Sequence, residues 1–307
     1  MGMRRLLLCS LVACGSPAAS VGDDVVADAP PLTGDMYALN FGPVTVHPGQ
    51  ENTQCVNLRL SNTTAIKVHQ MRNLLSTGSH HLILYKNDMD ATETTTPFDC
   101  TPFKGALNLS GRVAPVMITQ KQVDELTLPE AVAYTFDANQ MIRIEMHYIN
   151  ATDADIAVTA TAEFYAVPDS QVRDEADILF IGTPDITIAA GETKDIEAYF
   201  APGRASLDLS GAKFFAITGH THQLGTNVVV STSPTNAGVR TPIYTPKLFE
   251  WSEPETVVHK PEFAVPQGGG FDVKCSYHNT SNQAVGFGES ANDEMCFFWA
   301  YYYPSRG

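Results

Sequence analysis

Histidine is the residue type whose spacing in this sequence points most directly to chemistry. Nine histidines occur, and five of them fall in three short contexts. His220 and His222 stand two residues apart in Gly-His-Thr-His-Gln-Leu-Gly. Residues two apart on a strand share a face, so both imidazoles can reach one metal ion. A lone His-x-His pair is common, however, and two solvated side chains are the simpler interpretation until other ligands are found.

The second context is the adjacent pair His80 and His81. Neighbours on a regular strand point to opposite faces, so both can bind one ion only where a strand begins irregularly. The preceding residues, Ser-Thr-Gly-Ser at 76–79, are typical of such an irregular start. The pair alone is weak support for a metal site.

The third context is His147. Alternation along residues 142–148 places it on a polar strand face with Arg143 and Glu145, opposite the apolar residues Ile142, Ile144, Met146 and Tyr148. A histidine in this position is either an exposed side chain or a metal ligand.

A methionine near the C-terminus adds a different donor. In Glu294-Met295-Cys296, which opens an aromatic run, Met295 shares a strand side with Phe297, Trp299 and Tyr301, while Cys296 and Phe298 lie on the reverse. Methionine beside aromatic residues is usually core packing. Its thioether is also a soft ligand that suits Cu(I) far better than Zn(II), Mg(II) or Ca(II), which matters only if histidines stand nearby.

Composition narrows the class of protein. The 307 residues include 34 acidic and 19 basic side chains, giving a net charge of −15. Nucleic-acid binding requires an excess of Lys and Arg, so nucleic acid is not an expected partner. A hydrophobic content of 44% excludes a disordered chain. We interpret the acidic surface as solvation rather than a partner site.

The chain organisation predicts an all-β protein. Short alternating strands are separated by clusters of Asn, Asp, Gly and Pro, which is typical of β-sandwiches. The segment from Val123 to Leu128 is the best candidate for a helical turn. A polar stretch after the strand that ends near residue 165 predicts a domain boundary within residues 166–176.

The N-terminus predicts export. Residues 1–13 combine Arg4 and Arg5 with a short apolar run, as in a signal peptide. Leu11-Val12-Ala13-Cys14 resembles a bacterial lipobox, which predicts lipidation of Cys14; an ordinary cleaved signal is the alternative. Residues 14–35 are small, acidic and Pro-containing, as in a flexible tether. We therefore expect a membrane-anchored lipoprotein, periplasmic or at the cell surface, or a secreted protein if it is not lipidated.

Cysteine counting supports this destination. Six cysteines occur; the signal contains Cys9, and lipidation would use Cys14. The remaining four are Cys55, Cys100, Cys275 and Cys296. An even number in an exported chain predicts two disulfides.

Taken in order, these motifs resemble the copper type II, ascorbate-dependent monooxygenases, the family of peptidylglycine α-hydroxylating monooxygenase and dopamine β-monooxygenase. The shared order is a His-His pair, a His-Tyr strand, a His-Thr-His-x-Leu-Gly motif and a Glu-Met-Cys near the C-terminus. Leu128-Pro129-Glu130 and Gly286-Phe287-Gly288 are similar to the dopamine enzyme in particular. The resemblance spans roughly residues 36–304 and implies disulfides Cys55–Cys100 and Cys275–Cys296.

The resemblance implies two jelly-roll-like antiparallel β-sandwich domains, at 36–168 and 169–307, each with one copper ion, facing each other across a water-filled cleft. It implies that His80, His81 and His147 hold the electron-transfer copper. It also implies that His220, His222 and Met295 hold the catalytic, oxygen-binding copper. An ascorbate-like reductant would reduce both ions, and O2 would be used to hydroxylate a substrate C–H bond.

Three residues depart from the peptide-hydroxylating enzyme where specificity is set. Thr218 stands where that enzyme has an Arg for the peptide carboxylate, and Phe297 and Trp299 replace Asn and Tyr. A buried carboxylate here would lack charged partners, at a cost of about 2 kcal/mol or more. We therefore expect a neutral, apolar or aromatic small-molecule substrate that contacts Thr218, Phe297 and Trp299.

Two other functions remain open on the sequence. The first is a non-catalytic copper-binding exported lipoprotein, and the second is structural zinc at the histidines, against which Met295 argues. His47, His69, His259 and His278 match no ligand motif and are predicted to be surface or locally hydrogen-bonded residues. We expect a monomer whose only membrane contact is its lipid anchor.

Overall fold

The computed structural model describes residues 34–103, 112–202 and 208–306. These belong to one compact unit, Leu32–Gly307. The predicted signal peptide, Cys14 and the tether as far as residue 33 lie outside the described residues. Within the described ranges, no helix is both long enough and apolar enough to cross a membrane.

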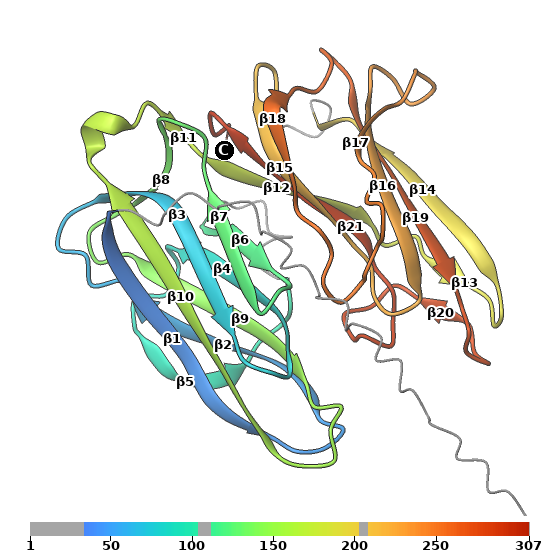
Figure 1. The fold of residues 1–307 in the computed structure, drawn as a ribbon, viewed down its shortest axis with the longest axis horizontal. Helices are drawn as coiled ribbons and strands as arrows, with labels where there is room; N and C mark the ends of the chain where they lie inside the picture. Colours follow the sequence, from blue (N-terminus) through green and yellow to red (C-terminus); the bar gives the residue numbers. More distant parts are fainter. Residues whose placement is uncertain (1–33, 104–111, 203–207, 307) are drawn as a thin grey trace, which may run out of the picture. The chain divides into compact units, whose positions relative to one another are not determined.

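The described chain is all-β, as predicted, and its sheets form antiparallel β-sandwiches (Figure 1). The first sandwich joins two sheets across a shared core. One sheet has the order β1 (Asp35–Val46), β10 (Ile156–Val167), β3 (Ile66–Leu75), β8 (Val132–Phe136), β11 (Asp174–Glu175), with β7 (Val123–Thr127) also paired to β3. The other has the order β5 (Thr94–Asp99), β2 (Glu51–Arg59), β9 (Met141–Ile149), β4 (Ser79–Asn87), β6 (Val113–Thr119).

The second sandwich follows the short helix η1 (Asp169–Gln171). Its first sheet has the order β12 (Asp177–Thr183), β21 (Cys296–Tyr303), β15 (Lys213–His220), β18 (Val257–Phe263). Its second has the order β14 (Thr193–Phe200), β19 (Gly270–His278), β16 (Gly225–Ser233), β17 (Thr241–Tyr244), and β13 (Thr187–Ile188) forms a ribbon with β20 (Val285–Gly286). Only β8 and β11 pair in parallel among these named strands.

Strand β21 has apolar or aromatic residues at every position, because each of its two faces packs into a hydrophobic core. Phe297, Trp299 and Tyr301 pack, with Met295, into the core that includes the first sandwich. Cys296 and Phe298 pack into the core of the second sandwich. The predicted division of these residues between two faces is therefore confirmed, and both faces are buried because the sheet is covered on both sides.

Both implied disulfides are present, Cys55–Cys100 and Cys275–Cys296. The helical turn predicted at Val123–Leu128 is wrong, because these residues begin with strand β7, which pairs with β3. Leu126 and Leu128 are buried and lie two residues apart, which is the spacing of a strand. In so short a segment the sequence pattern cannot distinguish this spacing from that of a helix.

We predicted that the first domain ends at residue 168, but one strand of the first sandwich comes later in the sequence. Strand β11 pairs with β8, and the strands of the second sandwich begin with β12 at Asp177. The division into domains 36–168 and 169–307 remains a prediction.

Replacing Asp124 is expected to change how stability depends on pH. Burial raises the pKa of Asp124 from 3.8 to about 6. The folded protein therefore holds this proton to a higher pH than the unfolded chain, and ionisation costs stability as the pH rises through this window. Asp124→Asn should raise the free energy of unfolding by about 2 kcal/mol at pH 8 and by much less at pH 4. Urea unfolding at both pH values measures it, with the exposed Asp153→Asn as the control.

Candidate metal centres

The first group of histidines lies where strands β4 and β9 meet. His81 and His147 are direct partners in the register of these antiparallel strands. The register shifts between Ser79 and His81, which places His80 at an irregular strand start. The irregularity predicted from the preceding Gly-Ser segment is therefore present, and it lets neighbouring histidines approach the same point.

These three side chains form a compact buried cluster. One ring nitrogen from each of His80, His81 and His147 lies within 4.8 Å of the others. Their ring centroids are 4.8 to 5.4 Å apart. Their exposed fractions are 7%, 1% and 3%, so the interpretation of His147 as an exposed side chain is wrong.

Several nitrogens in this cluster are buried without a hydrogen-bond partner: both ring nitrogens of His80 and Nδ1 of His81. Buried polar atoms are normally paired, so this set calls for a ligand. Burial also lowers the pKa of His80 to about 3 and that of His81 well below its ordinary value. Neutral imidazoles are the form that binds a metal ion, so the donor set fits a metal such as copper.

The second pair, His220 and His222, lies at the end of β15 and in the turn that leads to β16. Their rings are 5.2 Å apart and nearly perpendicular. Nδ1 of His220 is 3.1 Å from Oε1 of Gln120, and Nδ1 of His222 is 3.1 Å from the carbonyl oxygen of Asp293. Each Nδ1–H thus donates to an oxygen, which leaves the Nε2 lone pair free.

The Nε2 atoms of His220 and His222 are buried and unpaired, as in the first cluster. Burial lowers the pKa of His222 to about 4 and that of His220 well below its ordinary value. Two neutral imidazoles with free Nε2 atoms are suited to share one metal ion.

Met295 is tied to this histidine turn through the residue before it. Glu294 is fully buried, and its two carboxylate oxygens accept the backbone N–H groups of His222 at 3.0 Å and Leu224 at 2.7 Å. Burial raises the pKa of Glu294 to about 7, against the effect of these donors. The Met295 carbonyl accepts the hydroxyl of Tyr277 at 2.6 Å. The backbone on both sides of the Met295 side chain is therefore anchored.

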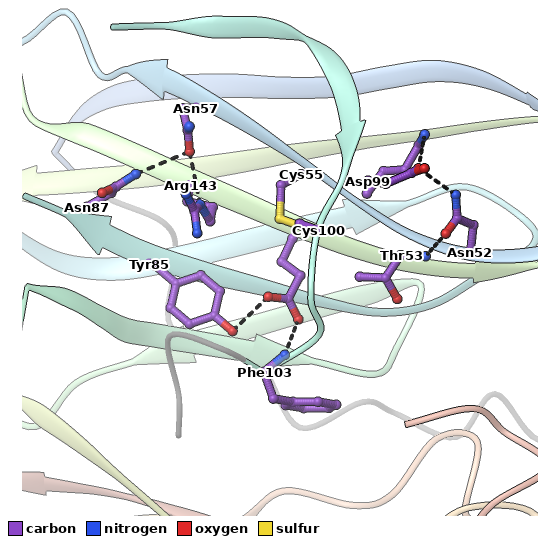
Figure 2. The surroundings of a disulfide bond; sticks show 12 residues. Asn52, Thr53, Cys55, Asn57, Tyr85, Asn87, Asp99, Cys100, Phe103 and Arg143 are labelled. Atoms are coloured by element: carbon purple, nitrogen blue, oxygen red, sulfur yellow. Dashed lines mark hydrogen bonds between the residues drawn. A yellow bond between two sulfur atoms is a disulfide. The ribbon is translucent and has the colours of Figure 1, made fainter. Parts of the chain in front are cut away.

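Phe103 is held in an unusual conformation next to the first disulfide. Its φ is +53°, a left-handed value uncommon for a bulky residue. Its N–H donates to the buried carboxylate of Glu145 at 2.9 Å, and the hydroxyl of Tyr85 donates to the same carboxylate at 3.1 Å. Figure 2 shows Phe103 and Tyr85 beside the Cys55–Cys100 bond. Burial raises the pKa of Glu145 to about 7.

This anchoring aims the Phe103 ring between the two histidine groups. The ring centroid is 5.0 Å from His81 and 6.1 Å from His220, and it stacks on Phe180 at 5.6 Å. Phe103 is 2% exposed. The resemblance implied a water-filled cleft between the groups; at this point an aromatic ring occupies the space.

Thr218, Phe297 and Trp299, the residues predicted to contact substrate, do lie on one sheet face with His220. In the register of β15 and β21, Thr218 opposes Trp299 and His220 opposes Phe297. All three are buried, and Phe180 stacks on Phe297 at 5.1 Å. The Thr218 hydroxyl is paired with that of Thr256 at 2.8 Å. The face is apolar, and Phe180 covers part of it.

Sequence reasoning missed four supports of these centres: Glu51, Phe103, Gln120 and the role of Glu294. Glu294 belongs to the Glu-Met-Cys motif, and its position next to Met295 is a signal in the sequence for this supporting role. Glu51 contacts His147 from a different strand. The hydrogen bond from His147 lowers the pKa of Glu51 to about 2. Nothing in the spacing of Glu51 indicates that contact.

The remaining four histidines are locally hydrogen-bonded, as predicted. Their partners are Asp155 for His47, the Val132 carbonyl for His69, Thr193 for His278 and the Ile243 carbonyl for His259.

Part of the chain matches a known protein family. Residues 174–306 match the model of the copper type II ascorbate-dependent monooxygenase C-terminal domain. The matched region contains His220, His222 and Met295. It also contains strand β21 (Cys296–Tyr303), which follows Met295.

Solved structures offer distant similarities. The major capsid protein P2 from bacteriophage PM2 is 10% identical, with a TM-score of 0.40, covering 89% of this chain and 99% of that one. The CBM22-1–CBM22-2 tandem domain of Xyn10C from Paenibacillus barcinonensis is 8% identical, with a TM-score of 0.19, covering 91% and 100%. Similarities of this extent carry no argument about function.

Proposed function

We propose that this protein is a copper type II ascorbate-dependent monooxygenase that hydroxylates a C–H bond of a neutral, apolar or aromatic small molecule. The C-terminal region matches this family. The observation that carries the proposal is the pair of buried histidine groups, each with ring nitrogens that have no partner. Unpaired, neutral nitrogens in a buried site are what metal ligation requires.

In this proposal, His80, His81 and His147 hold one copper ion, and His220, His222 and Met295 hold the second. Three imidazoles suit an ion that changes oxidation state, whereas two imidazoles and a thioether favour Cu(I). When bound, copper supplies the reduction of O2 and the hydroxylation of the substrate, with electrons from an ascorbate-like reductant.

The side chains of the protein would hold the ligands and exclude water. Gln120 and the Asp293 carbonyl fix the Nε2 atoms of His220 and His222 as the metal-facing nitrogens. Phe297 and Trp299 give the second centre an apolar wall, which suits a substrate without charge. Thr218 carries no charge to pair with a carboxylate, which argues against a peptide with a free C-terminus.

We further propose that the protein is exported and held at a membrane through a lipid on Cys14. The two disulfides support export, because such bonds persist in oxidising compartments. In this proposal the partners are the substrate, O2 and a reductant, without nucleic acid, and the protein acts as a monomer.

The test uses the protein loaded with copper. Metal analysis should find about two copper ions per chain, and apolar amines, alcohols and amides should cause reductant-dependent O2 uptake with a hydroxylated product. Two copper ions without turnover on any of these substrates would favour the non-catalytic copper-binding function. Zinc retained in preference to copper would contradict the proposal. Turnover of a peptide ending in glycine would contradict the proposed substrate class.

A further inference from the structure

Glu51 supports the first histidine cluster from the start of strand β2. Its Oε1 atom lies 2.8 Å from Nε2 of His147. The other ring nitrogen, Nδ1 of His147, lies 3.2 Å from Nε2 of His81. Because a carboxylate accepts hydrogen bonds, His147 carries its proton on Nε2 and turns Nδ1 toward the cluster. Glu51 thereby selects the nitrogen that His147 can offer to a metal.

The same oxygen of Glu51 also binds the second sandwich. Oε1 accepts the backbone N–H of Ala291 at 3.0 Å, and Oε2 is 3.4 Å from the hydroxyl of Ser290. These residues open a four-residue turn, closed by the Asp293 N–H donating to the Ser290 carbonyl at 2.9 Å. Glu294 and Met295 follow directly.

The far end of this turn reaches the second centre. The carbonyl of Asp293 is the acceptor for Nδ1 of His222 at 3.1 Å. An unbroken path therefore runs from His147 to Glu51, across the turn Ser290–Asp293, and on to His222. Each step of the path is a hydrogen bond or a peptide segment of the turn.

We propose that Glu51 is a positioning residue that fixes the orientation of His147 and, through the turn Ser290–Asp293, couples it to the orientation of His222. This inference rests on the two proposed metal centres, and goes beyond them by assigning a role to a residue outside the ligand set. Its consequence is that occupation of one centre stabilises the ligand geometry of the other.

Three variants separate the parts of this coupling. Glu51→Gln keeps Oε1, the atom that accepts from both His147 and Ala291. Glu51→Ala removes both hydrogen bonds. Ala291→Pro removes only the N–H of Ala291, at the second position of the turn, where proline is favoured. The exposed Glu130→Ala is the matched control for loss of a carboxylate.

The first measurement needs no metal. In the metal-free protein at pH 8, imidazole 15N chemical shifts should show His147 protonated at Nε2 in wild type, Glu51→Gln and Ala291→Pro. In Glu51→Ala they should show a mixture of tautomers, a change that a merely structural residue would not cause. An unchanged tautomer in Glu51→Ala overturns the inference.

The second measurement is Cu(I) affinity, by competition with a chelator. Glu51→Ala should weaken the nitrogen-only centre about ten- to a hundredfold, and Glu51→Gln much less. Ala291→Pro should leave each centre's own affinity nearly intact and remove the mutual strengthening between them. Equal Cu(I) affinities in wild type, Glu51→Ala and Ala291→Pro would overturn this inference but leave the proposed function standing. A wild-type chain that binds no copper would overturn both.

Discussion

Met295→Leu is expected to leave the protein folded and to lower hydroxylation on the order of 10²-fold or more. Leucine conserves the volume of this buried side chain, 2% exposed, so the cost in stability should be below about 1.5 kcal/mol. It cannot supply the sulfur, so the second copper would lose its soft ligand. X-ray absorption of the Cu(I) protein should show loss of sulfur scattering while the nitrogen-only centre is retained.

The control for this variant is Met71→Leu on strand β3, a fully buried methionine that lies outside both histidine groups. It should change neither turnover nor sulfur scattering. Full activity of Met295→Leu, or sulfur scattering that survives it, would show that Met295 is only a core residue.

Glu294→Gln is expected to have the largest effect on stability. Both oxygens of this fully buried carboxylate accept backbone N–H groups, from His222 and Leu224. In glutamine, one oxygen becomes an NH2 group that faces an N–H donor, so one hydrogen bond is lost. Leaving a buried donor unpaired costs about 2–4 kcal/mol, which lowers Tm by roughly 5 to 10 °C in a protein of this size.

The same substitution should release the histidine turn, so Cu(I) affinity should fall far more at the second centre than at the first. Thermal unfolding of the metal-free protein and chelator competition measure the two effects. The exposed Glu253→Gln serves as the control. If Glu294→Gln matches wild type in both Tm and Cu(I) affinity at the second centre, Glu294 does not stabilise the turn that contains His222.

Aromatic side chains contact both histidine groups. Phe103 contacts His81 and His220, and Trp251 of the second sandwich packs on His80 at 5.4 Å. The Phe103 ring thus lies near both histidine groups, in a region where the family resemblance implied a water-filled cleft. In the proposed function, a substrate that contacts Phe297 and Trp299 would have to displace Phe180, whose ring stacks on both.

The sequence alone determined the features that depend on residue type and local period. Alternation predicted the all-β fold and the two faces of β21, because a strand repeats every two residues. The Gly-Ser segment predicted the irregular start of β4. The even number of cysteines predicted two disulfides, and the family resemblance implied their pairing. It could not separate a strand from a helical turn at Val123–Leu128, because so short a segment fits either period.

The tertiary structure alone decided which distant groups support the histidines. Glu51 is 96 residues from His147, and Gln120 is 100 residues from His220. These contacts depend on strand register and on how the two sandwiches pack, neither of which leaves a spacing in the sequence. Burial was decided in the same way: the polar face of β9 is covered, so His147 is a buried side chain rather than a solvated one.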